Sequence, residues 1–296
     1  NFTDEAFEQA CRAAHLAGSR VYVTVNIVIK QSEMSDALQL IHRCSTLGAD
    51  AFIIQDWGLF FEVKRTMPDI ETHISTQANI HDDRGTIWCR EQGADRVTLS
   101  RELSIDEIAA IHNAAPDVDL EVFSHGAICF CYSGLCLLSS FAMAGRSANR
   151  GMCAQPCRME YTMGGRLEDS HPLSLKDNCL VDRLREIEDA GVACVKIEGR
   201  MKRPEYTGIV TGIYSKIIKE RREPTAEEMQ ILADAFSRQG FTQGYFNGDK
   251  ADMFGVRAET DKVGEKMFSD ARKEYIGKEE RRVPVKFYAV VNAGEA

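Results

Sequence analysis

The fold is decided by a short pattern that occurs twice, as Leu47-Gly48-Ala49-Asp50-Ala51 and as Gln92-Gly93-Ala94-Asp95-Arg96. In both copies a helical pattern ends near a glycine, a common residue at helix C-caps, and an apolar run follows at once. Ala190-Gly191-Val192-Ala193 repeats the arrangement before a later apolar run. Because a helix that leads through glycine into a buried strand is typical of βα units, the pattern predicts a parallel sheet.

The spacing of the apolar runs indicates how many units there are. Candidate strands cover residues 21–29, 51–55, 72–76, 96–99, 120–123 and 194–197, and the first five begin 21 to 30 residues apart. Helical patterns cover residues 4–16, 35–47, 85–92, 105–113 and 181–190. A barrel needs eight strands, and the chain begins in a helical pattern, so two further upstream βα units would complete the count.

An open, doubly wound sheet is the alternative to a barrel. Such a sheet that binds nucleotides has a glycine-rich loop after its first strand, and the sequence contains neither G-x-G-x-x-G nor a P-loop. We therefore expect an α/β fold of the (β/α)8 TIM-like barrel type, incomplete at its N-terminus and carrying a long Cys-rich insertion in one βα loop.

Composition restricts the class of protein. The 296 residues are 44% hydrophobic and 27% charged with 7 Pro, which is ordinary globular composition. The net charge of −9 has the wrong sign for a general nucleic-acid coat, although residues 146–158 and 196–203 are locally basic. No apolar stretch approaches the length of a membrane helix, and the start lacks a signal peptide. We expect an excised fragment of a cytoplasmic chain, with no membrane association and no stable protein partner.

The βα rhythm is interrupted between residues 124 and 177, after the carboxyl end of the 120–123 strand, where barrel active sites are built. A hairpin is expected at 161–167, with its turn at Gly164-Gly165. We divide the chain into a barrel domain at 1–203, with the Cys-rich insertion at 124–177, and a helical cap or linker at 204–277, with helices at 205–220 and 226–237. Residues 278–296 are expected to begin a further domain.

The interrupting region contains five of the ten cysteines, with the spacing C-x-C-x4-C-x16-C-x3-C: Cys129, Cys131, Cys136, Cys153 and Cys157. In a long chain without a secretory signal, metal binding is favoured over a disulfide scaffold. Zinc usually takes two tight knuckles, and the looser spacing here is easier to reconcile with a [4Fe–4S] cluster. The alternative is a set of small buried residues, which is also the favoured interpretation of the five scattered cysteines.

Polar residues at the expected carboxyl ends of strands are candidates for the site. Lys196, Glu198 and Arg200 alternate and should point the same way. Glu121 lies within its strand, and His125 follows shortly before Cys129. These five are the candidate catalytic residues. The alternatives are a buried structural ion network for Lys196, Glu198 and Arg200, a structural salt bridge for Glu121, and a place at the end of a strand or near the cluster for His125.

Other polar residues are candidates for binding a substrate. Arginine can hold carboxylates or phosphates with two parallel hydrogen bonds, and three arginines accompany the cysteines. The candidate binding residues are Arg146, Arg150, Arg158, Gln77, Arg101 and Lys176. Solvated arginines and ordinary polar residues at loop ends are the alternative.

Several ordered motifs resemble peptidase family U32, the collagenase-like proteases, and cover nearly the whole chain. They are Glu121-Val122-Phe123-Ser124-His125-Gly126-Ala127-Ile128-Cys129, Tyr132-Ser133-Gly134-Leu135-Cys136, Asn149-Arg150-Gly151-Met152-Cys153-Ala154-Gln155-Pro156-Cys157-Arg158, Leu173-Ser174-Leu175-Lys176-Asp177 and Val195-Lys196-Ile197-Glu198-Gly199-Arg200-Met201-Lys202. The segments Phe241–Phe246 and Arg282–Val285 resemble the long members that carry an extra C-terminal domain.

The resemblance implies a barrel that houses a [4Fe–4S] cluster bound by Cys129, Cys136, Cys153 and Cys157, with Cys131 outside the usual motif. It also implies an oxygen-independent hydroxylase. Known members form 5-hydroxycytidine in ribosomal RNA or 5-hydroxyuridine in transfer RNA, with prephenate as a co-substrate, or hydroxylate a ubiquinone precursor. RNA is thus the expected partner.

Three classes of function remain open: an RNA hydroxylase, a peptidase, and an iron–sulfur scaffold that only binds. The sequence contains no H-E-x-x-H for a metalloprotease and no G-x-S-x-G for a serine hydrolase. A cysteine protease needs a thiolate that a cluster would occupy as a ligand. The hydroxylase is the function we expect, because a redox cofactor supplies chemistry that side chains lack.

Overall fold

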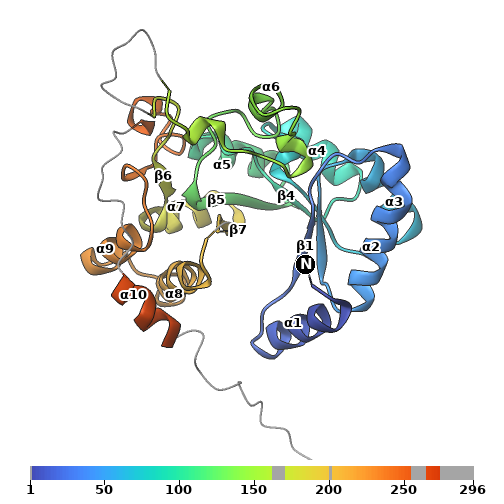
Figure 1. Ribbon diagram of the computed structural model, residues 1–296, viewed down its shortest axis with the longest axis horizontal. Helices are drawn as coiled ribbons and strands as arrows, with labels where there is room; N and C mark the ends of the chain where they lie inside the picture. The colour runs from blue at the N-terminus through green and yellow to red at the C-terminus, as the bar shows by residue number, and fades with distance from the viewer. Residues whose placement is uncertain (1, 162–170, 200–201, 255–264, 274–296) are drawn as a thin grey trace, which may run out of the picture.

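The structure is a computed structural model that describes residues 2–161, 171–199, 202–254 and 265–273. Its centre is one mostly parallel sheet (Figure 1). The eight strands are β1 (Tyr22–Val25), β2 (Ala51–Ile54), β3 (Thr72–Ile74), β4 (Arg96–Thr98), β5 (Asp119–Ala127), β6 (Asp177–Cys179), β7 (Val192–Ile197) and β8 (Phe241–Thr242). The α/β class expected from the βα rhythm is confirmed.

Strands β1 to β5 are adjacent in chain order and parallel, with registers such as Val23↔Phe52 and Val97↔Leu120. The sheet then branches at β5. Strand β7 pairs in parallel with β5 from Leu120 to His125, and β6 pairs antiparallel with the last three residues of β5, His125 to Ala127. Strand β8 pairs in parallel with β6. The branch brings the ends of β5, β6 and β7 together.

Helices cover the outside of this sheet. In Figure 1, α2 to α4 lie along β1 to β4, and α8 to α10 gather at the other end of the molecule. The helices are α1 (Asp4–Leu16), α2 (Met34–Thr46), α3 (Trp57–Thr66), α4 (Asp83–Glu91), α5 (Ile105–Ala114), α6 (Leu138–Ala142), α7 (Leu184–Asp189), α8 (Pro204–Glu220), α9 (Ala226–Ala235) and α10 (Glu265–Ala271). Among the described residues, no helix is long and apolar enough to cross a membrane.

Two hydrophobic cores hold these elements. The larger core packs one side of β1 to β5, including Phe52, Val97 and Leu120, against Ile41 and Leu59 of the outer helices. The smaller core packs α8 against α9, α10 and the start of α7. The polar side chains of β4, β5 and β7 that are described below lie on the opposite side of the sheet from Val97 and Leu120, because alternate residues of a strand face opposite ways.

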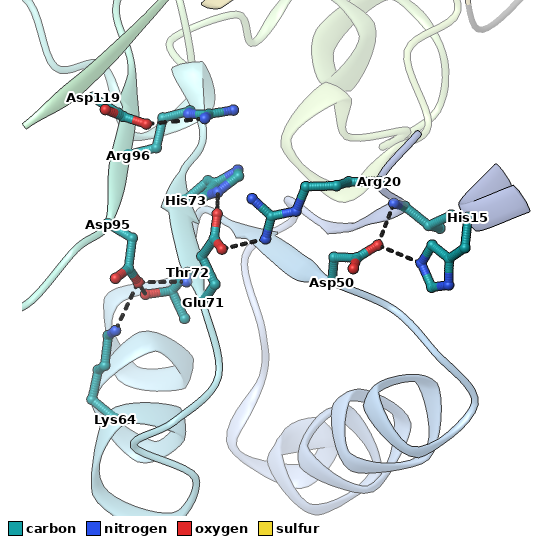
Figure 2. Close-up of polar contacts among 11 residues, drawn as sticks. His15, Arg20, Asp50, Lys64, Glu71, Thr72, His73, Asp95, Arg96 and Asp119 are labelled. Atoms are coloured by element: carbon teal, nitrogen blue, oxygen red, sulfur yellow. Dashed lines mark hydrogen bonds and ion pairs between the residues drawn. The ribbon is translucent and has the colours of Figure 1, made fainter. Parts of the chain in front are cut away.

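The pattern that predicted the βα units has a physical basis in its two aspartates. Asp50, before β2, accepts a hydrogen bond from Val21 N (2.6 Å) and contacts His15 (2.9 Å). Asp95, before β4, accepts one from Thr72 N (2.8 Å) and pairs with Lys64 (3.0 Å). Figure 2 shows these contacts side by side. Each aspartate thus fixes the start of the strand one position earlier in the sheet.

Figure 2 also shows the charges between and beside these aspartates. Glu71, just before β3, bridges Arg20 and His73, with 2.8 Å to the histidine. Arg96 of β4 pairs with Asp119 of β5 at 3.0 Å. The amino ends of β1 to β5 are therefore linked by a row of hydrogen bonds and ion pairs, which serves the scaffold.

Replacing Asp95 by alanine should lower the free energy of unfolding by about 1–2 kcal/mol, because Thr72 N loses a partly buried acceptor. Asp50→Ala should act similarly through Val21 N. Asp117→Ala, which removes an exposed carboxylate 3.9 Å from Arg90, is the matched control and should change little. Urea denaturation measures all three, and an equal loss in the control would contradict the role of the motif.

Several predicted boundaries are wrong. The strand expected at 21–29 ends at Val25, and the one expected at 120–123 continues to Ala127. Strands β6 and β8 and helix α3 were not predicted. The helix expected at 181–190 begins with a 3₁₀ turn, Val181–Arg183, before α7.

Three expectations stay untested. Within the described ranges β1 pairs only with β2 and β7 only with β5, so a closed barrel is not established. Most of the hairpin expected at 161–167 and all of 278–296 lie outside the described residues. The division into domains stays a prediction.

Candidate cysteine-rich site

The cysteine-rich segment connects β5 to β6 and carries α6 and two 3₁₀ turns, Ala148–Arg150 and Pro156–Arg158. In Figure 1 it is coloured green to yellow-green, and α6 stands above β4 and β5. All five of its cysteines are free thiols, of which Cys129 and Cys153 are exposed and the other three are half-buried. The segment therefore starts at the carboxyl end of β5.

The five thiols lie in one neighbourhood. Burial first, and then the thiols of Cys136, Cys157 and Cys129, raise the pKa of Cys131 to about 11. Burial also raises the pKa of Cys157, with Cys129 and Cys153 adding to the effect. In the protein alone these two groups are consequently neutral thiols at pH 7, and binding a metal would release their protons.

The described residues contain no group of three or more His, Cys, Asp or Glu side chains arranged for a single metal ion. Four thiolates around one zinc ion stand about 4 Å apart, as follows from the Zn–S bond length. In a [4Fe–4S] cluster each cysteine binds a different iron, which requires a wider spacing. Thiol side chains are the soft ligands that both zinc sites and iron–sulfur clusters use.

Arg158 fastens both ends of the segment. Its guanidinium donates to Ser174 Oγ (2.8 Å), Leu175 O (2.6 Å) and Ile128 O (2.5 Å). Ile128 and Leu175 lie near the two ends of the segment, and Arg158 follows Cys157 directly. Its charge is thus held close to the thiols of Cys129 and Cys157, which both interact with it electrostatically.

The other two arginines of the segment lie apart from Arg158. Arg150 pairs with both carboxylate oxygens of Glu33 (2.7 Å each) and donates to Val28 O (2.7 Å). This pairing lowers the pKa of Glu33 to about 2. Arg146 is exposed and donates through Nε to Met152 O at 3.2 Å. Arg150 therefore connects the segment to the scaffold, whereas the charge of Arg146 faces solvent.

A second polar set lies on the sheet, around Glu121 of β5, which is only 4% exposed. Glu121 Oε1 accepts from Lys196 Nζ (2.7 Å) and Thr98 Oγ1 (2.8 Å), and Cys194 Sγ donates to Oε2 (3.3 Å). Burial would raise the pKa of Glu121, but Lys196 and these donors hold its pKa below the ordinary value. Glu121 is thus an ionised carboxylate in a buried place.

The Phe123 ring extends this set toward the cysteines. Arg101 lies over the ring at 4.9 Å and Lys196 at 5.6 Å from its centroid. Arg101 Nη1 is buried and has no hydrogen-bond partner among the described residues. A small cavity of about 30 Å³ lies between Arg101, Phe123, Ile128 and Tyr245, so it connects Arg101 with the start of the cysteine-rich segment.

Other predicted site residues are placed elsewhere. His125 is 1% exposed and packs on Tyr206, Tyr214 and Phe241, with Nδ1 3.3 Å from Tyr214 Oη. Burial lowers the pKa of His125 to about 4. Its imidazole is thus a neutral core group, and His125 also lines the small cavity beside Arg101 and Phe123.

Three of the remaining predicted residues lie at or close to strand ends. Lys176 pairs with Asp252 at 2.7 Å. Gln77 lies beneath the cysteine loop, with its carbonyl oxygen accepting from Gln55 Nε2 at 3.3 Å. Glu198 follows the end of β7, and its amide donates to His125 O (2.9 Å). Arg200 lies outside the described residues.

Sequence reasoning missed several residues near the site. Thr98 and Cys194 face Glu121. Only the alternation of side chains along a strand could have identified them, because Cys194, for example, lies two residues before Lys196 and so points the same way. Lys202 lies at the end of a family motif but was not predicted as a site residue. Its ammonium lies 2.7 Å from the Phe236 ring centroid, and burial, with Arg238 nearby, lowers the pKa of Lys202 to about 8.

Comparison with known proteins agrees with the motifs. The model of peptidase family U32 matches residues 1–253. A 23S rRNA 5-hydroxycytidine synthase of Escherichia coli (strain K12) is 38% identical over 269 residues, 89% of this chain and 39% of that protein. The tRNA hydroxylation protein P of Haemophilus influenzae is 30% identical over 297 residues, 81% of this chain and 64% of that protein.

A collagenase of Porphyromonas gingivalis is also similar, 32% identical over 273 residues, 84% of this chain and 65% of that protein. The chain thus spans less than two thirds of the length of each of these relatives. The matched residues contain the whole cysteine-rich segment and the polar set around Glu121. The chain belongs to peptidase family U32.

Proposed function

We propose that the protein takes part in the oxygen-independent hydroxylation of an RNA base, at C5 of cytidine or uridine, with a [4Fe–4S] cluster as cofactor. The observation that carries this proposal is the gathering of five thiols after the carboxyl end of β5, the strand that also carries Glu121, the partner of Lys196. The names of the rRNA and tRNA relatives support RNA as the substrate. Because the chain covers only part of those relatives, the activity is proposed for the protein as a whole.

Cys129, Cys136, Cys153 and Cys157 are the proposed ligands, with Cys131 as a spare or alternative ligand. When bound, the cluster supplies electron transfer or Lewis acidity. The fixed guanidinium of Arg158 supports this assignment, since a cation beside Cys129 and Cys157 offsets the negative charge of thiolate ligands.

The chain's own polar groups would position the reactants. Lys196, held by Glu121, and Arg101, with an unpartnered buried nitrogen, lie against the same ring. Two cations in this arrangement suit an anionic co-substrate with two carboxylates. We therefore propose that Arg101 and Lys196 bind prephenate, and that the Glu121 carboxylate fixes the orientation of the Lys196 ammonium.

The proposed architecture around this site is a (β/α)8 barrel. Support comes from the parallel order of β1 to β5 and β7, and from the single partner that β1 and β7 each have among the described residues. Further strands pairing with those two edges would close the barrel. The cysteine-rich segment would then be an insertion at 124–177 of a barrel domain at 1–203, followed by a cap or linker at 204–277 and a further domain from 278.

A peptidase has weaker support. Its sequence-based rationale was an activated thiolate beside His125. The described His125 contacts aromatic rings of the smaller core, and burial raises the pKa of its cross-strand neighbour Cys179 to about 11, which makes that cysteine a poor source of thiolate. A scaffold that only binds a cluster would not need the buried Glu121–Lys196 pair. Both alternatives are outcomes of the test below.

The test is mass spectrometry of nucleosides from ribosomal and transfer RNA of strains with and without the gene. The deletion should abolish one 5-hydroxypyrimidine, and a gene carrying Cys136→Ala should fail to restore it. Cys44→Ala, which changes a buried cysteine of α2, is the matched control and should restore it. Unchanged nucleosides would contradict the hydroxylase, and gelatin cleavage by a Cys129→Ala/Cys136→Ala double variant would favour the peptidase.

A further inference from the structure

Exposed apolar side chains are concentrated in one part of the molecule. Among the described residues, seven of fifteen exposed large hydrophobic side chains fall between residues 130 and 159. They are Phe130, Tyr132, Leu135, Leu137, Phe141, Met152 and Met159, and we call them the apolar patch. Phe141 of α6 is 84% exposed and Tyr132 is 61% exposed. Exposed apolar side chains that are concentrated in one segment, rather than scattered singly, indicate an interaction surface.

The charge of the same residues is one-sided. Residues 130–159 contain three arginines and no aspartate or glutamate, although the whole chain has a net charge of −9. Arg150 is neutralised by Glu33, and Arg158 is fastened to backbone carbonyls. The guanidinium of Arg146 is exposed and is therefore available to bind an anionic partner. Aromatic rings with only positive charge between them match a nucleic acid better than they match an ordinary protein surface.

The patch adjoins the proposed chemistry. Phe130 and Tyr132 flank Cys131 in the chain, and the Phe130 ring lies 6.5 Å from the exposed ring of Phe254. Helix α6, which carries Phe141, contacts the other end of the cysteine-rich segment through Ser139 Oγ, 3.9 Å from Cys153 Sγ. Exposed rings therefore lie next to Cys131 in the chain and on the helix that contacts Cys153.

We propose that the apolar patch is a stacking surface for unpaired nucleotides of the RNA substrate, with Tyr132 and Phe141 as the main rings and Arg146 at the phosphates. This inference rests on the proposed function. Chemistry on a base requires that the base leave its stack, and exposed rings replace the lost stacking contacts. Duplex RNA, whose bases are already stacked, would gain little from such a surface.

The test is the affinity for a fluorescent single-stranded RNA of about ten nucleotides and for the same strand in a duplex, measured by anisotropy. The protein should prefer the single strand. Tyr132→Ala and Phe141→Ala should each weaken binding between about fivefold and a hundredfold, as expected for one stacked base. Tyr132→Phe, which keeps the ring, should retain affinity. Arg146→Gln should weaken binding and reduce the dependence on salt.

Phe61→Ala and Trp88→Ala are the matched controls, because these rings are 41% and 39% exposed on α3 and α4. Both should bind as the wild type does. The proposal would be overturned if the patch variants bound RNA as tightly as the wild type, or if the control variants lost as much affinity as the patch variants. Patch-dependent binding to phosphatidylserine vesicles with RNA affinity unchanged would also overturn it.

The binding assay needs no turnover, so the surface and the proposed function can fail separately. Patch-dependent RNA binding by a protein whose deletion leaves all 5-hydroxypyrimidines in place would contradict only the hydroxylase. Loss of those nucleosides on deletion, with RNA affinity unaffected by Tyr132→Ala and Phe141→Ala, would contradict only the surface.

Discussion

Replacing Gly134 by alanine is expected to detach the loop that carries Cys131 and Cys136 from the 3₁₀ turn Thr76–Ala78, which follows β3. Gly134 has φ +74, a backbone conformation that costs an L-residue about 1–2 kcal/mol. A Cβ there would also stand 2.1 Å from the carbonyl oxygen of Gln77, which is main chain and cannot swing aside. Together with the steric cost of the added Cβ, the free energy difference that favours the native loop position should fall by about 3 kcal/mol.

The readout is the rate at which the half-buried thiols react with an alkylating reagent, followed by peptide mass spectrometry. A loss of about 3 kcal/mol raises the open population about a hundredfold, so Cys131 and Cys136 should be modified about a hundredfold faster. Cys129, which is already exposed, should change much less.

Gly145→Ala is the matched control for this substitution. Gly145 has a similar φ of +78, but a Cβ there meets nothing within 4 Å. It should show only the backbone cost of about 1–2 kcal/mol. If the two variants changed the reactivity of Cys131 and Cys136 equally, close packing of Gly134 on Gln77 would not be what holds the loop.

The order of the sheet could be predicted from sequence because the βα signal is local. Gly and Asp in the repeated pattern act within a few residues of the strand they precede. The ends of strands depend on distant partners instead. The run at 21–29 stays apolar, yet Val28 N donates to Asn149 O (3.1 Å) and Ile29 N to Asp56 Oδ2 (3.0 Å), which removes both amides from the sheet.

Strands β6 and β8 could not be predicted because they are three and two residues long and mostly polar. Their pairing depends on the branch at β5, which brings together distant positions: Asp177 pairs with Phe241, 64 residues later, and the His125 ring contacts the Phe241 ring, 116 residues later. Hydrophobic periodicity has no meaning over so few residues.

In the candidate site, too, features within one short segment could be predicted from sequence, whereas contacts between distant residues could not. The cysteines lie within 29 residues, so their gathering was accessible from spacing. The role of Arg150 was not, because its partner Glu33 lies 117 residues away. Arg158 binds backbone carbonyls, whose positions no residue type reveals. His125 is a reasonable catalytic candidate from sequence alone. Its packing against Tyr206 and Tyr214 of α8 could not be predicted, because these residues lie some 80 to 90 positions later in the chain.

Replacing Lys196 by methionine should produce the largest loss of stability among the substitutions at the sheet. Lys196 keeps its hydrocarbon volume as methionine but loses the ammonium that pairs with Glu121 at 2.7 Å. An uncompensated carboxylate would remain in a place where Glu121 is 4% exposed. Breaking a buried pair in this way costs about 3–5 kcal/mol at neutral pH, and the partial exposure of Lys196 favours the lower value.

The pH dependence of this loss identifies its cause. In the wild type the pKa of Glu121 lies below its ordinary value, so its contribution to stability is present above that ordinary value and is lost as pH falls through the folded-state pKa. Without Lys196, burial should raise the pKa of Glu121 above its ordinary value. The sign then reverses, because the variant keeps its stability at low pH and loses it as pH rises through the raised pKa. The difference from wild type should therefore be larger at pH 7 than at pH 4.

Glu121→Gln and the double variant complete a thermodynamic cycle, with free energies of unfolding from urea denaturation at both pH values. Glu121→Gln should cost about 1–2 kcal/mol, because the Lys196 ammonium can still reach water while the amide keeps a partner in Thr98. The double variant should recover much of what Lys196→Met loses at pH 7, because no charge remains buried. Two results would contradict this explanation. One is an equal loss of unfolding free energy in Lys196→Met at pH 4 and pH 7. The other is a loss in the double variant equal to the sum of the losses in the two single variants, since the buried charge of Glu121 would then not be the cause.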